Sequence, residues 1–540
     1  MRKTVMLAAA WLVLAPLAAA AQSAVDEPVF SASEVRAHVE FLADDLLEGR
    51  DNGTRGFDIA ARYVATRFDA MGLRPGGTEG WYQPVNRIDY SLDTDAPPEL
   101  GVGSKKFANG GDLAIGPSPR FGSERQTVAA GAVFVGYGRE EDYAGLDVRG
   151  KFVVAFATLP EPAPSPPPAR LDVAAGHGAV GMLYLVTPED QKGKIDWERV
   201  VAAQLESRQQ WQEPDAPNGL QIGAYVKGAV AEALFKGASQ SAAQLYAAAA
   251  AGTPVKGFAL APRVTAARTS SVEIAKSENV IGILPGSDPA LAGEYVVLSA
   301  HLDHEGVDMM ADPGADAIHN GAMDNAAGVA TMLEAARAFT QGGKRPRRSI
   351  LFVALTAEED GLIGSSYLAR HPVVGKGKVV ADVNLDMPIL LYDFQDVVAF
   401  GAEHSTLGPI VARAAAKMGV TLSPDPMPEE QLFLRSDHYS FVKAGVPSVF
   451  LVTGFKNGGE KAFRDFLANH YHKVSDDLNQ PFDWAAGAKF ARINYLIARE
   501  IADAPEAPRW YEGNVYGNRY AKDAPKAPRA ENAPSPAAAK

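Results

Sequence analysis

The chain contains no cysteine among its 540 residues. Disulfide bridges, thiolate metal sites and lipid attachment through an N-terminal cysteine are therefore excluded. The folded protein must be held together by its hydrophobic core. Any metal site must be built from histidine and carboxylate side chains.

Positive charge is also scarce, because 52 lysines and arginines stand against 65 aspartates and glutamates, for a formal net charge of -13. Nucleic acids bind basic surfaces, so this balance predicts no nucleic-acid partner. The hydrophobic fraction of 47% is that of an ordinary globular protein, and the length predicts two or three domains.

Long apolar runs are missing beyond the N-terminus, so we expect no membrane span in the mature chain. The N-terminus has Arg2 and Lys3 before a short apolar stretch, with Ala19 and Ala21 as small residues before Gln22. This pattern is typical of a secretory signal peptide over residues 1–21, the alternative being a membrane anchor. It predicts export, with a periplasmic or secreted location after cleavage.

Changes in sequence texture divide the rest of the chain. Residues 111–274 hold short β-type runs such as AGAVFVGYG and VGMLYLVTP, separated by glycine and proline, and we interpret them as an inserted β-rich α/β domain. Residues 22–110 and 275–505 flank this insert and would form the main domain. Residues 506–540, rich in proline and alanine, are predicted to be a disordered tail.

The main domain has an α/β rhythm. Continuous apolar runs such as NVIGIL, YVVLSA and SILFVALT predict strands buried on both faces, and helical patterns separate several of them. This alternation predicts an α/β fold with a mostly parallel central sheet flanked by helices.

Histidines and carboxylates follow five of the predicted elements. One acid after a strand is usually a solvated loop tip or a helix cap. Five separate strand ends or loops, however, each bring a metal-ligand type to one edge of the sheet, where α/β proteins bind ligands. The residues are His301, Asp303, His304, Asp324, Glu358, Glu359, Asp386, His472 and Asp476.

Histidine and carboxylate ligands without cysteine suit zinc, and there are enough of them for two ions. A carboxylate has two oxygens and can bridge two cations. Of the neighbours Glu358 and Glu359, we expect one to bind metal and the other to take a proton from water. The two tasks need separate side chains, because a carboxylate engaged by zinc loses its basicity.

The motifs H-L-D, D-N-A-A-G, A-E-E-x-G-L-x-G-S, N-L-D-M, S-D-H-Y and Y-H-x-x-x-D occur in this order. In this combination the chain resembles the M28 family of zinc aminopeptidases with a protease-associated (PA) domain insert. The resemblance covers the main domain and the insert, and it implies a zinc-exopeptidase fold. Pro388 departs from the glycine that the family often has after the D-M pair, which puts the shape of that loop in doubt.

The resemblance also implies roles for individual residues. His301 and Asp386 would bind one zinc ion, Glu359 and His472 the other, and Asp324 would bridge them. Three further residues would act in catalysis: Glu358 as general base, Asp303 as acceptor of a hydrogen bond from His301, and Tyr471 as hydrogen-bond donor to the oxyanion. His304 is expected beside the metals rather than on them, and His319 at the rim.

These roles describe an aminopeptidase with two zinc ions, in which a metal-bridging hydroxide attacks a peptide that has a free N-terminus. A carboxypeptidase or dipeptidase on the same scaffold is one alternative, and Arg435 is its candidate for binding a substrate carboxylate. A glutaminyl cyclase with one zinc and a receptor-like binding module are two others. Side-chain preference and oligomeric state do not follow from the sequence.

Overall fold

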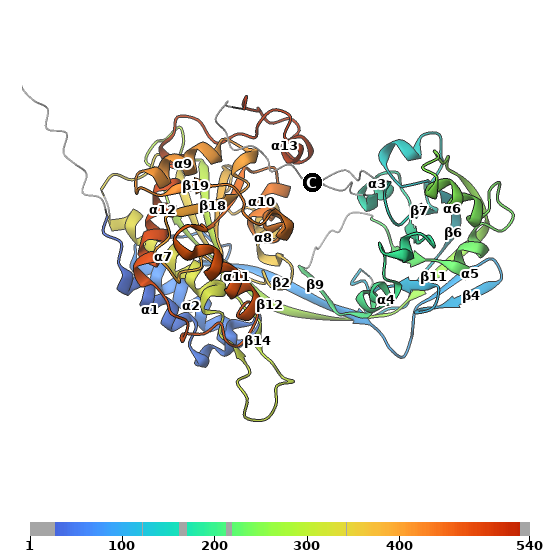
Figure 1. Cartoon of the computed structure of the whole chain (residues 1–540), viewed down its shortest axis with the longest axis horizontal. Helices are drawn as coiled ribbons and strands as arrows, with labels where there is room; N and C mark the ends of the chain where they lie inside the picture. Colours follow the sequence, from blue (N-terminus) through green and yellow to red (C-terminus); the bar gives the residue numbers. More distant parts are fainter. Residues whose placement is uncertain (1–27, 121, 161–169, 212–218, 342, 530–540) are drawn as a thin grey trace, which may run out of the picture.

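The computed structural model describes residues 28–120, 122–160, 170–211, 219–341 and 343–529. The predicted signal peptide and the last residues of the predicted tail lie outside these ranges. Figure 1 shows two bodies, a larger one that contains α1, α7 and α12 and a smaller one that contains β6 and α5. Long strands, among them β2 and β12, run between the two bodies.

The larger body is built on a ten-stranded sheet with the order β19-β18-β20-β17-β13-β16-β12-β2-β9, and β1 pairs with β12. The strands are β1 (Arg74–Pro75), β2 (Tyr82–Leu92), β9 (Arg208–Trp211), β12 (Ser270–Leu284), β13 (Glu294–His301), β16 (Ser349–Leu355), β17 (Lys378–Leu385), β18 (Asp396–Phe400), β19 (Thr421–Ser423) and β20 (Ser448–Thr453).

The direction of the strands differs across this sheet. The neighbours β20, β17, β13 and β16 are parallel, as are β18 and β19. The pairs β18–β20, β16–β12, β12–β2, β2–β9 and β1–β12 are antiparallel. The prediction of a mostly parallel sheet is therefore wrong beyond the centre. The antiparallel half contains β2 and β12, which extend toward the smaller body. Antiparallel neighbours need no crossover helix between them.

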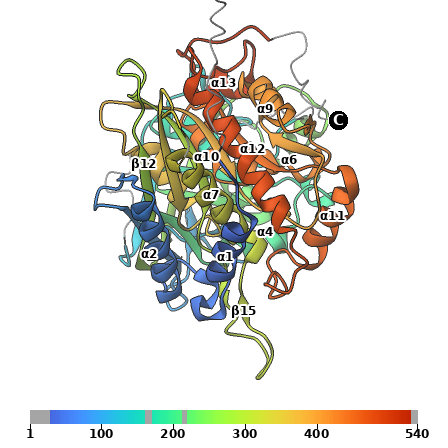
Figure 2. The ribbon, with the colours of Figure 1, turned by 90° about the vertical axis from the view of Figure 1, so that its left-hand side faces the viewer.

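Helices cover both faces of the sheet, and Figure 2 shows one layer in front. This layer contains α1 (Ala32–Leu42), α2 (Arg55–Ala70), α7 (Gly328–Gln341), α9 (Leu407–Ala416) and α12 (Trp484–Asp503). Ser31, Thr54 and Asp483 begin three of them by accepting a main-chain N–H bond. The main hydrophobic core lies between this layer and the sheet. On the opposite face, α8 (Ile363–Arg370) and α10 (His438–Lys443) cover a smaller core.

The smaller body has its own eight-stranded sheet, in the order β4-β3-β11-β6-β7-β8-β10-β5, and its own core. Its strands are β3 (Glu99–Val102), β4 (Lys105–Ala108), β5 (Leu113–Ile115), β6 (Gln126–Phe134), β7 (Phe152–Phe156), β8 (Gly181–Leu185), β10 (Ile222–Val226) and β11 (Phe258–Arg268). Its helices are α3 (Arg170–Gly176), α4 (Trp197–Leu205), α5 (Gly228–Leu234) and α6 (Ala242–Ala250). This sheet begins with β3, ahead of residue 111, and β9 crosses back to pair with β2.

The segment 506–529 was predicted to belong to a disordered tail, and this prediction is wrong. The segment contains α13 (Val515–Tyr520) and forms bridges from Trp510 to Ser405 and from Tyr511 to Ala527. Trp510 is only 2% exposed and donates an Nε1–H bond to the carbonyl of Gly445. The few aromatic side chains of segment 506–529 pack against apolar residues. The proline and alanine content of the sequence did not reveal this packing. Among the described residues, no helix has the length and hydropathy to cross a membrane.

Candidate metal centre

The predicted ligands lie together at one edge of the larger sheet. His301 is the last residue of β13, and Asp386 directly follows β17. Glu358 and Glu359 follow β16. Because β13, β16 and β17 are parallel neighbours, their carboxyl ends meet at this edge.

Two further segments reach the same edge from outside the sheet. Asp324 lies in a π-helical turn, Ala322–Ala327, immediately before α7, and its peptide bond to Asn325 is cis. His472 lies in the loop after α11 (Gly459–Asn469).

The ligand atoms form two groups that share Asp324. His301 Nε2 lies 3.1 Å from Asp324 Oδ1 and 3.2 Å from Asp386 Oδ1. His472 Nε2 lies 3.5 Å from Asp324 Oδ2 and 3.1 Å from Glu359 Oε2. The structure thus brings together all five residues predicted as metal ligands, with one oxygen of Asp324 facing each histidine.

These distances suit ligands of a common ion. Two donors about 2.0–2.2 Å from a zinc ion lie roughly 3.3–3.5 Å apart at a tetrahedral angle. His472 Nε2 is buried and has no well-aligned hydrogen-bond partner among the described residues. In the part of the chain that the structure describes, the ion pairs of Asp324, Glu359 and Asp386 are all to histidines. Several buried carboxylates without lysine or arginine partners fit a divalent cation.

Glu358 and Glu359 have opposite electrostatic surroundings. Burial raises the pKa of Glu358 well above its usual value, and nearby carboxylates add to this against the opposing effect of His301. Burial and the charge of Asp324 also raise the pKa of Glu359, but the hydrogen bond with His304 and the close approach of His472 outweigh them and lower the pKa to about 2. Two neighbouring carboxyls with separated pKa values can serve as proton acceptor and as ligand.

Asp303 supports the centre differently from what the sequence predicted. His301 Nδ1 lies 3.1 Å from the main-chain carbonyl oxygen of Asp303, not from its carboxylate. The carboxylate instead accepts the main-chain N–H groups of Glu358, at 3.2 Å, and Glu359, at 3.3 Å. The backbone carbonyl of Asp303 thus lies beside His301, while its side chain holds the turn that carries both glutamates.

Two residues of the same segment reach the second group of ligands. His304 Nδ1 lies 2.7 Å from Glu359 Oε1, which is a hydrogen-bond distance and shorter than the spacing between ligands of one ion. Glu305, which the sequence analysis missed, lies 2.7 Å from His472 Nδ1. A carboxylate on one ring nitrogen orients the other nitrogen toward a metal. The signal was present in the run H-L-D-H-E at the end of a strand.

Other hydrogen bonds fix the aspartates. Asp476 accepts the main-chain N–H groups of Met323, at 2.8 Å, and Asp324, at 2.9 Å, and so holds the π-helical turn. Ser436 donates to Asp386 Oδ2 at 2.6 Å. His319, expected at the rim, has its Nδ1 atom 3.7 Å from Glu305.

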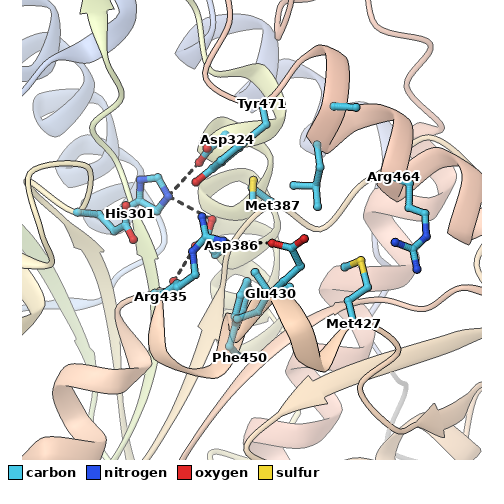
Figure 3. A pocket seen from close by; sticks show the side chains of 15 residues that line it. His301, Asp324, Asp386, Met387, Met427, Glu430, Arg435, Phe450, Arg464 and Tyr471 are labelled. Atoms are coloured by element: carbon cyan, nitrogen blue, oxygen red, sulfur yellow. Dashed lines mark hydrogen bonds and ion pairs between the residues drawn. The ribbon is translucent and has the colours of Figure 1, made fainter. Parts of the chain in front are cut away.

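A cavity of about 400 Å³ opens beside the centre. His301, Asp324, Glu358 and Asp386 form its polar wall, and Figure 3 shows His301 facing Asp324 and Asp386. The remaining wall is mostly apolar and comes from Met387, Met427, Leu432, Phe450, Leu467, Ala468 and Tyr471. Glu430, Arg435, Ser436 and Arg464 supply the other polar groups.

Tyr471 lies at the border of the cavity and the ligands. Its ring centroid is 3.8 Å from that of His472, and burial raises the pKa of its hydroxyl. The hydroxyl therefore stays protonated at neutral pH and is available as a donor.

The chain is similar to known peptidases over part of its length. The model of peptidase family M28 matches residues 279–498. Leupeptin-inactivating enzyme 1 of Streptomyces exfoliatus is 28% identical over 280 residues, which cover 49% of this chain and 57% of that protein. Leucine aminopeptidase 1 of Neurospora crassa is 28% identical over 237 residues, which cover 42% and 54%. The chain thus spans about half the length of these curated relatives.

Among solved structures, an aminopeptidase from Aneurinibacillus sp. strain AM-1 aligns with 88% of this chain and 95% of its own. Its identity is 19% and the TM-score is 0.44. The family match, by contrast, spans the segment that holds every residue of the centre described above. Over residues 279–498, this chain is similar to peptidase family M28.

Proposed function

We propose that the chain is an aminopeptidase that uses two zinc ions to remove N-terminal residues from peptides. The observation that carries this proposal is the placement of Asp324 between two histidine–carboxylate groups on the wall of an open cavity. His301, Asp324 and Asp386 would hold one ion. Asp324, Glu359 and His472 would hold the other.

When bound, the two ions would supply Lewis acidity that polarises the scissile carbonyl and activates water. The side chains supply the proton transfers. Glu358 lines the cavity and takes a proton from the attacking water, then returns it to the leaving amine. The carboxylate of Asp303 holds this glutamate by accepting its main-chain N–H, and the hydroxyl of Tyr471 donates a hydrogen bond to the developing oxyanion.

The cavity favours an aminopeptidase over a carboxypeptidase or dipeptidase. A substrate carboxylate would need a free arginine or lysine near the reacting carbonyl. Arg435 Nη1 lies 3.6 Å from Glu430 Oε2, and Arg464 Nε lies 3.1 Å from Glu460 Oε1, so both cavity arginines already have acidic partners. The apolar wall suits the side chain of an N-terminal residue. The two ligand groups favour two ions over the single zinc of a glutaminyl cyclase.

We also propose that the protein is exported and that its smaller body is a PA-type domain. The N-terminal sequence supports export to the periplasm or the medium. We assign the smaller body to the PA type, because it is a β-rich α/β domain inserted between β2 and β12 of the larger sheet.

Hydrolysis of amino-acid anilides by the purified chain tests this function. We expect release from free-amine anilides, loss of release after chelation and recovery with zinc. N-acetylated anilides serve as the matched control and should not react. Chelator-insensitive hydrolysis, or equal hydrolysis of acetylated and free substrates, would reject the proposal.

A further inference from the structure

A line of buried polar side chains leads away from Asp386. Ser436 Oγ lies 2.6 Å from Asp386 Oδ2, and Asn384 Nδ2 lies 2.6 Å from Ser436 Oγ. Asn384 Oδ1 lies 3.1 Å from Ser299 Oγ, which lies 2.8 Å from Asp382 Oδ1. Asp382, Ser299 and Asn384 are 0% exposed, so their hydrogen bonds must be made within the protein.

The fold places these groups in a row. Ser299 on β13 and Asn384 on β17 are direct partners in the parallel pair of strands. Asp382 lies two residues before Asn384 and therefore on the same face of β17. Ser436 comes from the loop that leads into α10.

The number of available protons gives the hydrogen bonds of this row a single donor-to-acceptor direction. An amide donates only through its nitrogen, so Asn384 donates to Ser436, whose single hydroxyl proton is left for Asp386. Asn384 Oδ1 must then receive the only proton of Ser299. The contact between Ser299 and Asp382 at 2.8 Å therefore needs a proton from Asp382.

The other assignments each leave a buried contact without a proton. An ionised Asp382 would take the proton of Ser299 and leave two oxygens facing each other, on Ser299 and Asn384. A reversed Asn384 amide would take the proton of Ser436 and leave its oxygen bare against Asp386 at 2.6 Å. Such unmade hydrogen bonds are costly at fully buried positions.

The surroundings of Asp382 also favour its neutral form. Its Oδ2 atom is buried and has no hydrogen-bond partner in the part of the chain that the structure describes. Burial raises the pKa of Asp382 well above its usual value; the contact with Ser299 opposes this, and the charge of Asp437 adds to it.

We propose that Asp382 is a neutral carboxylic acid and a positioning residue for Asp386. Its proton orients Ser299, Asn384 and Ser436 in turn, so that the hydroxyl of Ser436 donates to Oδ2 and Oδ1 faces the metal position. The inference rests on the proposed function, since it assigns Asp386 as a zinc ligand. A neutral acid at the end of the row adds no charge to a centre already rich in carboxylates.

Infrared spectroscopy tests the neutral acid without any activity assay. The difference spectrum between the wild type and Asp382→Asn should contain the carbonyl stretch of a protonated carboxylic acid at neutral pH, with and without zinc. Its absence from both spectra would overturn the assignment. This result stands even if the chain binds no zinc, so it is independent of the proposed function.

Zinc affinity, measured by competition with a chromophoric chelator, tests the positioning role. Asp382→Asn keeps a donor without charge and should bind zinc as the wild type does. Asp382→Ala should bind one of the two ions about 10-fold more weakly, the size typical of lost partners of a metal ligand. Asp396→Asn, at a buried aspartate on β18, is the control and should not change zinc affinity. Wild-type affinity in Asp382→Ala, or equal losses in both Asp382 variants, would reject the role.

Discussion

At the scale of single residues, surroundings separate side chains of the same chemistry. Glu358 and Glu359 are adjacent in the sequence, yet only Glu359 has histidines within hydrogen-bond distance. Glu358 lines the cavity instead and donates its main-chain N–H to Asp303. The different surroundings of the two glutamates therefore follow from the direction of each side chain and not from position in the sequence.

Substitutions should separate the two glutamates. Glu358→Ala should keep zinc and lower kcat by about 10²–10⁴, the range for a lost general base. Glu359→Ala should lose zinc as well, because it removes a ligand. Metal content by mass spectrometry and turnover of an anilide report both effects. Equal zinc loss in the two variants would contradict this division of roles.

His38 makes stability depend on pH. It is 1% exposed, and burial, with smaller effects from Arg67 and Arg337, lowers its pKa from 6.5 to about 4. The unfolded chain thus takes up a proton before the folded one does, and the folded state loses stability as the pH falls from 6.5 to about 4. The full loss from this group is about 3 kcal/mol.

The variant His38→Gln cannot be protonated and should show a flatter curve. Urea unfolding of chelator-treated protein between pH 7 and pH 5 measures the difference and removes any contribution of bound metal. His371→Gln, at an exposed histidine, should follow the wild type. Parallel curves for the wild type and His38→Gln would show that His38 does not contribute.

The sequence was sufficient to group the candidate metal ligands. His301, Asp324, Glu359, Asp386 and His472 were predicted because strand ends and motif order mark them. The residues that hydrogen-bond to these candidate ligands were harder to predict, because a hydrogen bond depends on where the backbone turns. The carboxylate of Asp303 was assigned to the wrong partner, while Glu305 and the serine beside Asp386 went unnoticed.

At the scale of elements, residues 301–305 at the end of strand β13 contact both groups of candidate ligands. His301 faces Asp386, Asp303 holds the turn of Glu358 and Glu359, and His304 and Glu305 reach Glu359 and His472. A shift of this short segment would therefore disturb both metal positions together.

Removal of the carboxylate of Glu305 should weaken zinc binding at the position of His472. We expect Glu305→Ala to lower the affinity for one ion about 10-fold or more, because Nδ1 of His472 loses the partner that orients its ring. Chelator competition measures it. Asp312→Ala, an exposed acid farther along the same connection, should leave the affinity unchanged. A similar loss of zinc affinity in both variants would indicate that the change in net charge, rather than the orientation of the His472 ring, lowers the affinity.

The C-terminal segment is a structural element rather than a free tail. Trp510→Ala should lower the free energy of unfolding by about 3–5 kcal/mol, because it opens a cavity and removes the hydrogen bond to Gly445. Val515→Ala, at a side chain that is 47% exposed in the same segment, should cost little. Urea unfolding compares the two, and equal stabilities would show that this packing contributes nothing.

At the scale of the whole molecule, one sheet edge collects ligands from distant parts of the chain. The α/β fold was predictable, because buried apolar runs alternate with helical patterns. The antiparallel half of the sheet was not, because apolar content does not give strand direction. The return of β9 to the larger sheet was equally hidden, since its four residues, RQQW, carry no alternating apolar pattern.

Ligands that meet only after folding should couple zinc binding to global stability. A ligand that binds only the folded state stabilises it by about 2.7 kcal/mol when its free concentration is 100 times its Kd. We therefore expect the Tm to fall on chelation and to recover with zinc. Asp324→Ala should lose most of this response, because that residue serves both groups. An unchanged Tm in the wild type would mean that the centre holds no ion.

The pairing of β2 with β12 has a consequence for how the chain can be cut and rejoined. Leu92 and Ser270 are opposite each other in this pair, and Asp93 donates its main-chain N–H to the carbonyl of Thr269. The chain therefore leaves the larger body after β2 and re-enters it before β12 at neighbouring points, while β9 also returns to pair with β2. Replacing residues 94–268 with a two-residue turn would close the hairpin of β2 and β12 and would remove β9 from the edge of the larger sheet.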